Sequence, residues 1–227
     1  MNIVVTGANR GIGLGFARHY LAQGAEVWAC YRREQGGLAS IQHRSLHLLQ
    51  WDVVQDMRED RLQAAGVPDR IHLLINNAGI YGPKAEAGQS LEGVTRETML
   101  EVFEVDCVGP LRVVQALKER IIRARGVIAN VSSKMGSSAD NSSGGCYAYR
   151  AAKAALVICS RSMAIDLGSK GVRVITLHPG WVRTDMTDGT GLVGVSESVT
   201  GLASVIENAA AYEPGAFVAF DGKLVPY

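Results

Sequence analysis

Residues 3–13 read IVVTGANRGIG, and this stretch decides the fold. Its first three residues form a short apolar run typical of a buried strand, and a glycine-rich turn follows directly. Apolar residues then recur at helical spacing from Leu14 to Gln23. Glycines in such a turn let the backbone approach a phosphate at the N-terminus of the next helix. The stretch therefore predicts a strand, a phosphate-binding turn and a helix.

The glycines of this turn are Gly7, Gly11 and Gly13, spaced Gly-x-x-x-Gly-x-Gly. This spacing differs from the Gly-x-Gly-x-x-Gly fingerprint of many dinucleotide-binding proteins. A glycine-rich turn can also be purely structural. Its position between the first strand and the first helix favours phosphate binding.

Six further short apolar runs alternate with longer amphipathic stretches along the chain. They are residues 27–30, 46–49, 71–75, 127–131, 172–177 and 217–220. Such alternation is typical of βαβ units. It predicts one Rossmann-type doubly wound α/β domain over residues 1–227, with about seven parallel strands and helices on both faces of the sheet. Ligands in such folds bind beyond the carboxyl ends of the strands, so the loop after each run is a candidate site.

Composition and charge narrow the class of function. The chain has 227 residues, 23 basic and 22 acidic, with a formal net charge of +1, so its charge favours neither nucleic acid nor an acidic membrane. We find no leader before the first apolar run and no run of transmembrane length. The four cysteines lack Cys-x-x-Cys spacing, and we expect no metal site. These features predict a cytoplasmic protein with a small-molecule partner.

The residues after the second run bear on the choice of cofactor. Dinucleotide folds that prefer NAD place an acidic residue there, roughly 20 residues beyond the glycines. This chain has Arg32 and Arg33 instead, and Arg10 of the turn could approach the same place. Because arginine offers a fork of donors to phosphate oxygens, the pattern favours NADP(H), with NAD(H) as the alternative. The two arginines could also be solvated charges that Glu34 partly neutralises.

Two later strand ends add candidates. Asp52 and Val53 follow the third run, where the carboxylate could face an adenine amino group or cap a helix. Residues 76–79, which read NNAG, follow the fourth run. Small residues there would let the backbone lie along a cofactor, and asparagine side chains can fasten adjacent strands.

Tyr149 and Lys153 are four positions apart in a stretch of helical spacing, so we expect them on one face of a helix. A nearby ammonium lowers the pKa of a phenol, and Ser133 could hold a carbonyl beside them. Tyr147 is a weaker candidate, because the residue four positions on is Ala151. Alone, Tyr-x-x-x-Lys is a weak signal, since exposed tyrosine and lysine one turn apart are common.

In their order along the chain, these motifs closely resemble those of the short-chain dehydrogenase/reductase family. The matching residues are Thr6-Gly7-x-x-x-Gly11-x-Gly13, Asn76-Asn77-Ala78-Gly79, Ser132-Ser133, Tyr149-x-x-x-Lys153, and Pro179-Gly180 followed by Thr184. Within the family, residues 144–150, 178–186 and 221–226 are similar to the C-factor-like and sniffer-like carbonyl reductases.

The resemblance implies an NADP-dependent oxidoreductase that reduces a small or medium carbonyl compound, or oxidises the alcohol, by hydride transfer. Tyr149 would exchange a proton with the substrate oxygen, and Ser133 would hydrogen-bond the carbonyl. Lys153 would lower the pKa of Tyr149 and bind the cofactor ribose. Ser133 rather than Ser132 matches the family pattern, and side chains alternate along a strand end.

The candidates for cofactor contact lie in the strand-end loops and on the helix of Tyr149. They are Gly7, Asn9, Arg10, Gly11, Ile12, Gly13, Arg32, Asp52, Val53, Asn77, Ala78, Gly79, Tyr149, Lys153, Pro179, Gly180, Val182 and Thr184. We expect Tyr81, Trp181, Met186 and the loop around Leu192 and Val193 to limit substrate size. Ser196 is expected to cap the helix that follows.

The chain departs from the family pattern in two places. Asp106 stands where the family commonly has asparagine, and we include it among the catalytic candidates. Its charge would raise the pKa of Lys153 and weaken the effect of Lys153 on Tyr149, which predicts retained but slower chemistry. The gap from Ser133 to Tyr149 is longer than usual. Its serine and glycine content predicts a mobile loop that shapes the substrate entrance, or a tolerated insertion.

The sequence allows two interpretations of the function class and of the oligomeric state. The complete Ser133, Tyr149 and Lys153 set favours an enzyme, whereas Asp106 and the C-factor-like resemblance keep a cofactor-binding regulatory protein with little turnover as the alternative. Apolar surface on the expected helices at 102–122 and 151–167 suits a homodimer or homotetramer, but burial within one chain would also explain it.

Overall fold

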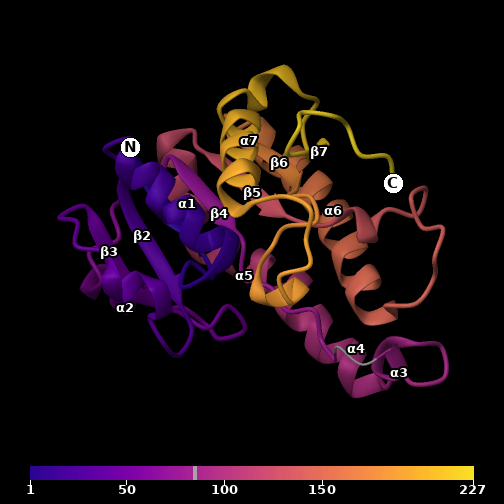
Figure 1. Ribbon diagram of the computed structural model, residues 1–227. Coiled ribbons are helices and arrows are strands. Elements are labelled where there is room, and N and C mark those ends of the chain that lie inside the picture. Colours follow the sequence, from indigo (N-terminus) through magenta and orange to yellow (C-terminus); the bar gives the residue numbers. More distant parts are fainter. Residues whose placement is uncertain (84–85) are drawn as a thin grey trace.

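The computed structural model, which describes residues 1–83 and 86–227, is built around a sheet of seven parallel strands (Figure 1). The strands are β1 (Asn2–Val5), β2 (Glu26–Tyr31), β3 (Leu46–Gln50), β4 (Leu73–Asn76), β5 (Val127–Val131), β6 (Arg173–His178) and β7 (Phe217–Ala219). Their order across the sheet is β3-β2-β1-β4-β5-β6-β7, so chain order reverses between β1 and β4. The predicted doubly wound fold is confirmed, and the reversal is where such sheets bind ligands.

Helices cover both faces of the sheet. One face packs against α1 (Gly11–Ala22) and α7 (Val195–Glu207), which lie side by side in Figure 1. The other face packs against α2 (Glu59–Ala64), α5 (Gly109–Ala124) and α6 (Tyr147–Gly168). Two short helices, α3 (Glu86–Gln89) and α4 (Arg96–Phe103), extend from the body beside the start of α6. In the described part of the chain, no helix is long and apolar enough to cross a bilayer.

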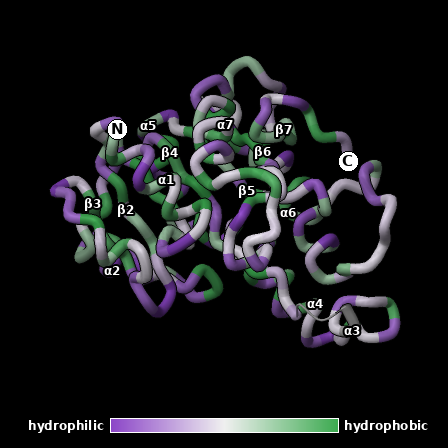
Figure 2. Tube along the Cα trace, viewed as in Figure 1, coloured by the Kyte–Doolittle hydropathy of each residue, from purple (hydrophilic) through white to green (hydrophobic). Residues whose placement is uncertain are grey.

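The strands are hydrophobic because both of their faces are buried. In β1, Ile3 and Val5 face the α1 and α7 side, where they join Phe16 and Leu202. Val4 faces the opposite side. Figure 2 shows the strands coloured mainly as hydrophobic. Burial of each such side chain stabilises the folded state by about 1.5–3 kcal/mol. A strand buried on both faces therefore appears in the sequence as a short uninterrupted apolar run, the pattern from which these strands were predicted.

The stretch expected as one helix over residues 102–122 is divided into three parts. The helix α4 ends at Phe103, a π-helical turn spans Glu104–Val108, and α5 begins at Gly109. Pro110 has no N–H for the carbonyl four residues back, which belongs to Asp106. The missing hydrogen bond accounts for the irregular turn, and π turns of this kind often occur at functional sites.

Two helix starts differ from the sequence expectation. The helix α1 begins at Gly11 rather than Leu14, so the glycine turn supplies its first residues. The prediction that Ser196 caps the next helix was wrong, because α7 begins at Val195 after Gly194, without a side-chain cap. Ser198 instead donates to the Pro179 carbonyl oxygen at 2.7 Å, which ties α7 to the loop after β6.

Candidate active site

The candidate residues gather along one edge of the sheet. Because all the strands are parallel, their carboxyl ends share this edge. The loops that meet there are residues 6–13 after β1, 32–33 after β2, 51–53 after β3, 77–79 after β4, 132–133 after β5 and 179–184 after β6. Candidate residues that lie far apart in the sequence are therefore close together at this edge of the sheet.

The glycine turn has no room for side chains where the chain folds back on itself. A Cβ on Gly13 would lie 2.3 Å from the Gly7 carbonyl oxygen and 2.5 Å from Nδ2 of Asn77. Gly7 has a φ of +61°, and a Cβ there would lie 2.8 Å from the Cα of Ala78. The first turn of α1 also lacks acidic residues and a side-chain cap. The backbone amides at the start of α1, beside closely packed glycines, fit the pyrophosphate of a dinucleotide.

Polar contacts fasten the end of β4 to its neighbours. Asn77 donates from Nδ2 to the Thr6 carbonyl oxygen at 3.0 Å, and its own N–H donates to the Thr6 hydroxyl at 3.0 Å. Asn76 donates to Oδ1 of Asn130 on β5 at 2.8 Å. The expectation that these asparagines join adjacent strands is confirmed. Their contacts hold residues 77–79 beside the glycine turn.

Three arginines were considered for the cofactor phosphate. Arg32 and Arg33 are exposed directly after β2. Arg10 instead reaches the loop after β6, where its Nη1 atom lies 3.5 Å from Oδ2 of Asp185. Thr184 lies against Gly11, since a Cβ on that glycine would be 3.4 Å from its methyl group. The glycine turn and the loop after β6 therefore face each other.

Asp52 and Val53, two of the candidate cofactor-contact residues, lie in the loop after β3. Asp52 accepts a hydrogen bond from the N–H of Val54 at 3.3 Å, and the next helix, α2, begins at Glu59. The interpretation of Asp52 as a helix cap was therefore wrong. Val53 is 7% exposed, and its side chain packs against Gly109.

Tyr149 and Lys153 lie on the buried face of α6, 8% and 4% exposed. The Lys153 Nζ atom is 5.6 Å from the centre of the Tyr149 ring, and Ser133 lies near enough to lower the pKa of Tyr149. Ser132 faces away and donates to the Lys153 carbonyl oxygen at 2.9 Å. Tyr147 is 39% exposed. The structure thus brings Ser133, Tyr149 and Lys153 together.

Asp106 forms a buried ion pair with Lys153. Its Oδ2 atom is 3.1 Å from Nζ, and its side chain is fully buried. The other carboxylate oxygen accepts the Ile80 N–H at 2.8 Å, and Lys153 also donates to the Val131 carbonyl oxygen at 3.1 Å. A Cβ on Gly79 would lie 3.3 Å from both charged groups, so a glycine backbone covers the pair.

Burial and neighbouring charges shift the pKa values of Tyr149, Asp106 and Lys153. Burial raises the pKa of Tyr149 above its ordinary value, although Lys153 opposes this, and Asp106 adds to the increase. The pKa of Asp106 is raised by burial against the attraction of Lys153. Burial would lower the pKa of Lys153, but Asp106 and Tyr149 outweigh it, so that pKa is raised. Lys153 lowers the pKa of Tyr149, as expected, but desolvation of the phenolate outweighs it, so the net shift is upward.

Tyr81, one of the residues expected to limit substrate size, contacts Tyr149 directly. The ring centre of Tyr81 lies 4.9 Å from that of Tyr149, and its hydroxyl lies 2.8 Å from Sγ of Cys146. Trp181, Met186 and Leu192 are 52%, 39% and 75% exposed on the loop after β6. These apolar side chains are available to contact a bound substrate.

Arg150 binds the serine- and glycine-rich loop before α6. Its guanidinium donates to the carbonyl oxygens of Met135 and Gly145, both at 3.1 Å, and to the Ser143 hydroxyl at 2.9 Å. The predicted mobility of this loop stays a prediction. Sequence reasoning did not identify the anchoring role of Arg150, because its partners, mostly main-chain oxygens, are distributed over the loop.

The family model for short chain dehydrogenases matches residues 1–191. The protein belongs to the short-chain dehydrogenase family. This short-chain dehydrogenase is 38% identical to C-signal of Myxococcus xanthus over 161 residues, 69% of this chain and 93% of C-signal.

Among solved structures, this short-chain dehydrogenase is similar to two carbonyl reductases over its full length. The NADPH-bound carbonyl reductase from chicken fatty liver is 32% identical, with a TM-score of 0.86 and 98% of that chain covered. Carbonyl reductase Sniffer of D. melanogaster is 29% identical, with a TM-score of 0.90 and 99% covered. The predicted resemblance to C-factor-like and sniffer-like proteins is confirmed.

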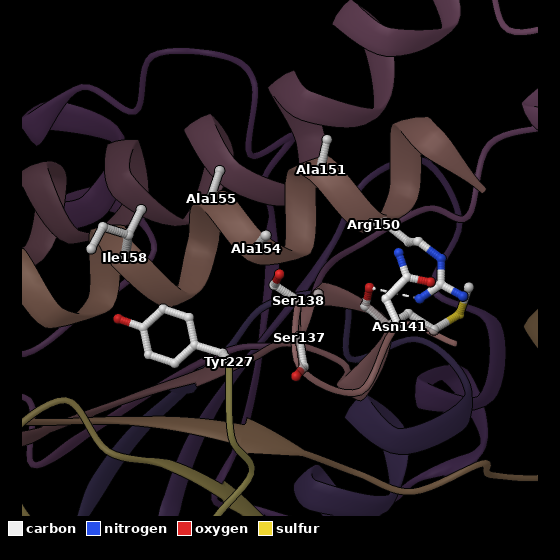
Figure 3. A pocket seen from close by; sticks show the side chains of 11 residues that line it. Ser137, Ser138, Asn141, Arg150, Ala151, Ala154, Ala155, Ile158 and Tyr227 are labelled. Carbon is white, nitrogen blue, oxygen red and sulfur yellow. Dashed lines mark hydrogen bonds between the residues drawn. The ribbon is translucent and has the colours of Figure 1, made fainter. Parts of the chain in front are cut away.

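A separate groove of about 450 Å³ lies on the outer face of α6 in this short-chain dehydrogenase. Figure 3 shows Ala151, Ala154 and Ile158 along one wall and Tyr227 opposite them. Ser133, Tyr149, Lys153 and Asp106 do not line it. The groove is therefore distinct from the candidate active site.

Proposed function

We propose that this short-chain dehydrogenase is an NADP(H)-dependent carbonyl reductase acting on small or medium aldehydes and ketones. The observation that carries the proposal is the cluster of Ser133 with the buried Tyr149 and Lys153, beside a glycine turn that fits a pyrophosphate. The full-length similarity to an NADPH-bound carbonyl reductase supports both the reaction and the cofactor.

Each residue of the cluster has a role in the proposed reaction. The bound cofactor would supply hydride to the carbonyl carbon. Ser133 would hydrogen-bond the carbonyl oxygen, and Tyr149 would give that oxygen its proton. Lys153 would hold the cofactor ribose and stabilise the phenolate that remains. Burial raises the pKa of Tyr149, and the protonated phenol is the form that reduction needs.

The cofactor would extend from this cluster across the sheet edge. Residues 7–13 would bind the pyrophosphate, with contacts from residues 77–79 and 179–184. Arg32 would bind the 2′-phosphate that distinguishes NADPH from NADH. Asp52 and the backbone of Val53 would contact the adenine.

The proposal also includes a homodimer through the outer faces of α5 and α6. Leu111, Ile158 and Ile165 are 36%, 53% and 67% exposed there. Apolar side chains on neighbouring helices suit an interface between two copies. Light scattering after size-exclusion chromatography would measure the mass, and Ile158→Asp with Ile165→Asp should leave a monomer. A homotetramer is the alternative outcome for the unaltered chain.

The deciding experiment follows NADPH consumption with a panel of aldehydes, ketones and diketones, beside NADH. The expected result is turnover that prefers NADPH. Tight NADPH binding, measured by its fluorescence, without turnover on any carbonyl would overturn the reductase. That outcome would favour a cofactor-binding regulatory protein, the class that the similarity to C-signal supports.

A further inference from the structure

The helix that carries the catalytic phenol begins without a cap of its own. Cys146 precedes α6 with a φ of +50° and makes no side-chain capping bond. The first intrahelical hydrogen bond runs from the N–H of Arg150 to the Cys146 carbonyl oxygen at 2.9 Å. The N–H groups of residues 147–149 therefore need partners from outside the helix, as at every helix start. Tyr149 lies in this first turn.

Gln89, at the end of α3, supplies one of these partners. It is 3% exposed, and its Oε1 atom accepts the N–H of Tyr149 at 3.0 Å. Its Nε2 atom donates to the carbonyl oxygens of Tyr81 at 2.7 Å and Pro83 at 3.3 Å. An N–H on one side and two carbonyls on the other leave only one orientation of the amide that satisfies all three partners.

The same amide thereby joins Tyr149 to Tyr81. The two rings also touch directly, with centres 4.9 Å apart. The hydroxyl of Tyr81 reaches Sγ of Cys146, immediately before α6. Tyr81 is thus held at its backbone by Gln89 and at its hydroxyl by Cys146.

We propose that Gln89 is a positioning residue that sets the placement of the Tyr149 phenol relative to the substrate wall at Tyr81. The inference rests on the proposed reductase function. Without Gln89, the Tyr149 N–H would be buried without an acceptor, and the first turn of α6 would shift or fray to reach one. A displacement of about 1 Å at a reacting group lowers a rate by about 100-fold. Cofactor binding should not change, because the glycine turn makes no contact with Gln89.

The test compares Gln89→Met, Gln89→Glu and the surface control Gln63→Met. Methionine has a similar size but neither donates nor accepts effectively, so kcat should fall at least about 10-fold while the Kd for NADPH stays within about twofold. Burial and the two facing carbonyl oxygens raise the pKa of a carboxyl at this position, so glutamate would be protonated, accept the Tyr149 N–H and donate to the Tyr81 carbonyl oxygen. It is the conservative variant and should retain both kcat and the KM for the carbonyl substrate within about threefold. Gln63, on the exposed side of α2, should give unaltered kinetics.

Hydrogen exchange provides a readout that does not depend on turnover. The amide of Tyr149, followed in peptides covering residues 146–152, should exchange faster in Gln89→Met and retain protection in Gln89→Glu. Unchanged exchange in Gln89→Met, or an unchanged kcat, overturns the positioning role. If Gln89→Met does not fold, the pH dependence of Gln89→Glu decides instead: a carbonyl KM that does not rise at the pH where the glutamate ionises and loses its donor overturns the role. If the unaltered protein reduces no carbonyl, the reductase proposal fails, and exchange at Tyr149 still decides the placement by Gln89.

Discussion

The two halves of the candidate site are built from different parts of the chain. The cofactor half, between β1 and β4, depends on backbone: Gly7 and Gly13 pack so closely that a Cβ has no space. The catalytic half, between β5 and α6, depends on ionisable side chains, and Asp106, Tyr149 and Lys153 are 0%, 8% and 4% exposed.

This difference separates two kinds of sensitivity. A backbone cradle fails when atoms are added to it, and its failure should appear as weaker binding. A buried charged cluster fails when a functional atom is removed, and its failure should appear as slower chemistry or a shifted pH dependence. Substitutions in the two halves should therefore change different kinetic constants, and each prediction below tests that separation.

The largest effect is expected from Tyr149→Phe. Loss of the proton donor should lower kcat by about 1000-fold, and the Kd for NADPH should stay within about twofold, because the phenol is remote from the glycine turn. Tyr147→Phe, two positions away on the same helix and 39% exposed, is the matched control and should leave kcat unchanged. Steady-state kinetics and NADPH fluorescence measure both quantities. More than a tenth of the activity left in Tyr149→Phe would refute the assignment.

The second effect is expected from Gly13→Ala. Its Cβ would overlap the Gly7 carbonyl oxygen and Nδ2 of Asn77, so NADPH binding should weaken by about 100-fold and the protein should lose about 1–3 kcal/mol of stability. Gly168→Ala, at the end of α6 with no atom within 4 Å of its Cβ, should change neither. Calorimetric titration and thermal unfolding provide the measurements. Unaltered NADPH affinity in Gly13→Ala would show that the turn does not cradle the cofactor.

A smaller effect should distinguish the two nicotinamide cofactors. Arg32→Ala removes a charged donor from the end of β2, so the Kd for NADPH should rise about 10-fold, while the Kd for NADH should not change. Arg18→Ala, an exposed arginine on α1, controls for the loss of positive charge alone. Equal weakening of both cofactors by Arg32→Ala would place the 2′-phosphate elsewhere.

The smallest effect is a shift in pH dependence from Asp106→Asn. The Asp106 charge helps to raise the pKa of Tyr149 and of Lys153, so its removal should lower both. Reduction needs the protonated phenol, so the alkaline limb of kcat should move to lower pH. Asp56→Asn, an exposed carboxylate paired with Arg112, should leave the profile in place. Identical profiles for the unaltered protein and Asp106→Asn would dispose of the charge argument.

Part of the candidate site could be predicted because the sequence patterns that mark it are short. The glycine spacing and the four-residue step from Tyr149 to Lys153 depend on neighbours within a few positions, and helix or strand periodicity then places them. Asn76 and Asn77 were correctly expected to fasten strands, because a side chain at the end of a parallel strand lies beside its neighbours.

Other features were inaccessible or wrongly predicted because their partners are distant in sequence. Gln89 lies 60 positions from the amide that it caps, and no pattern around it indicates that contact. Ser196 looked like a helix cap, yet Gly194 already provided the extended residue before α7. The direction of the Tyr149 pKa depended on the balance between burial and the Lys153 charge, and burial cannot be measured from residue identity.

The sequence by itself determined the parallel α/β fold, the glycine turn and the residues of the candidate catalytic set, because these follow from short-range periodicity and from residue chemistry. Only the tertiary structure decided how that set is arranged: the burial of the Asp106 and Lys153 pair, the raised pKa of Tyr149, and the link from Tyr149 through Gln89 to Tyr81. Solvent exclusion and contacts between distant segments arise only when the chain has packed, so they depend on the whole fold rather than on any one stretch.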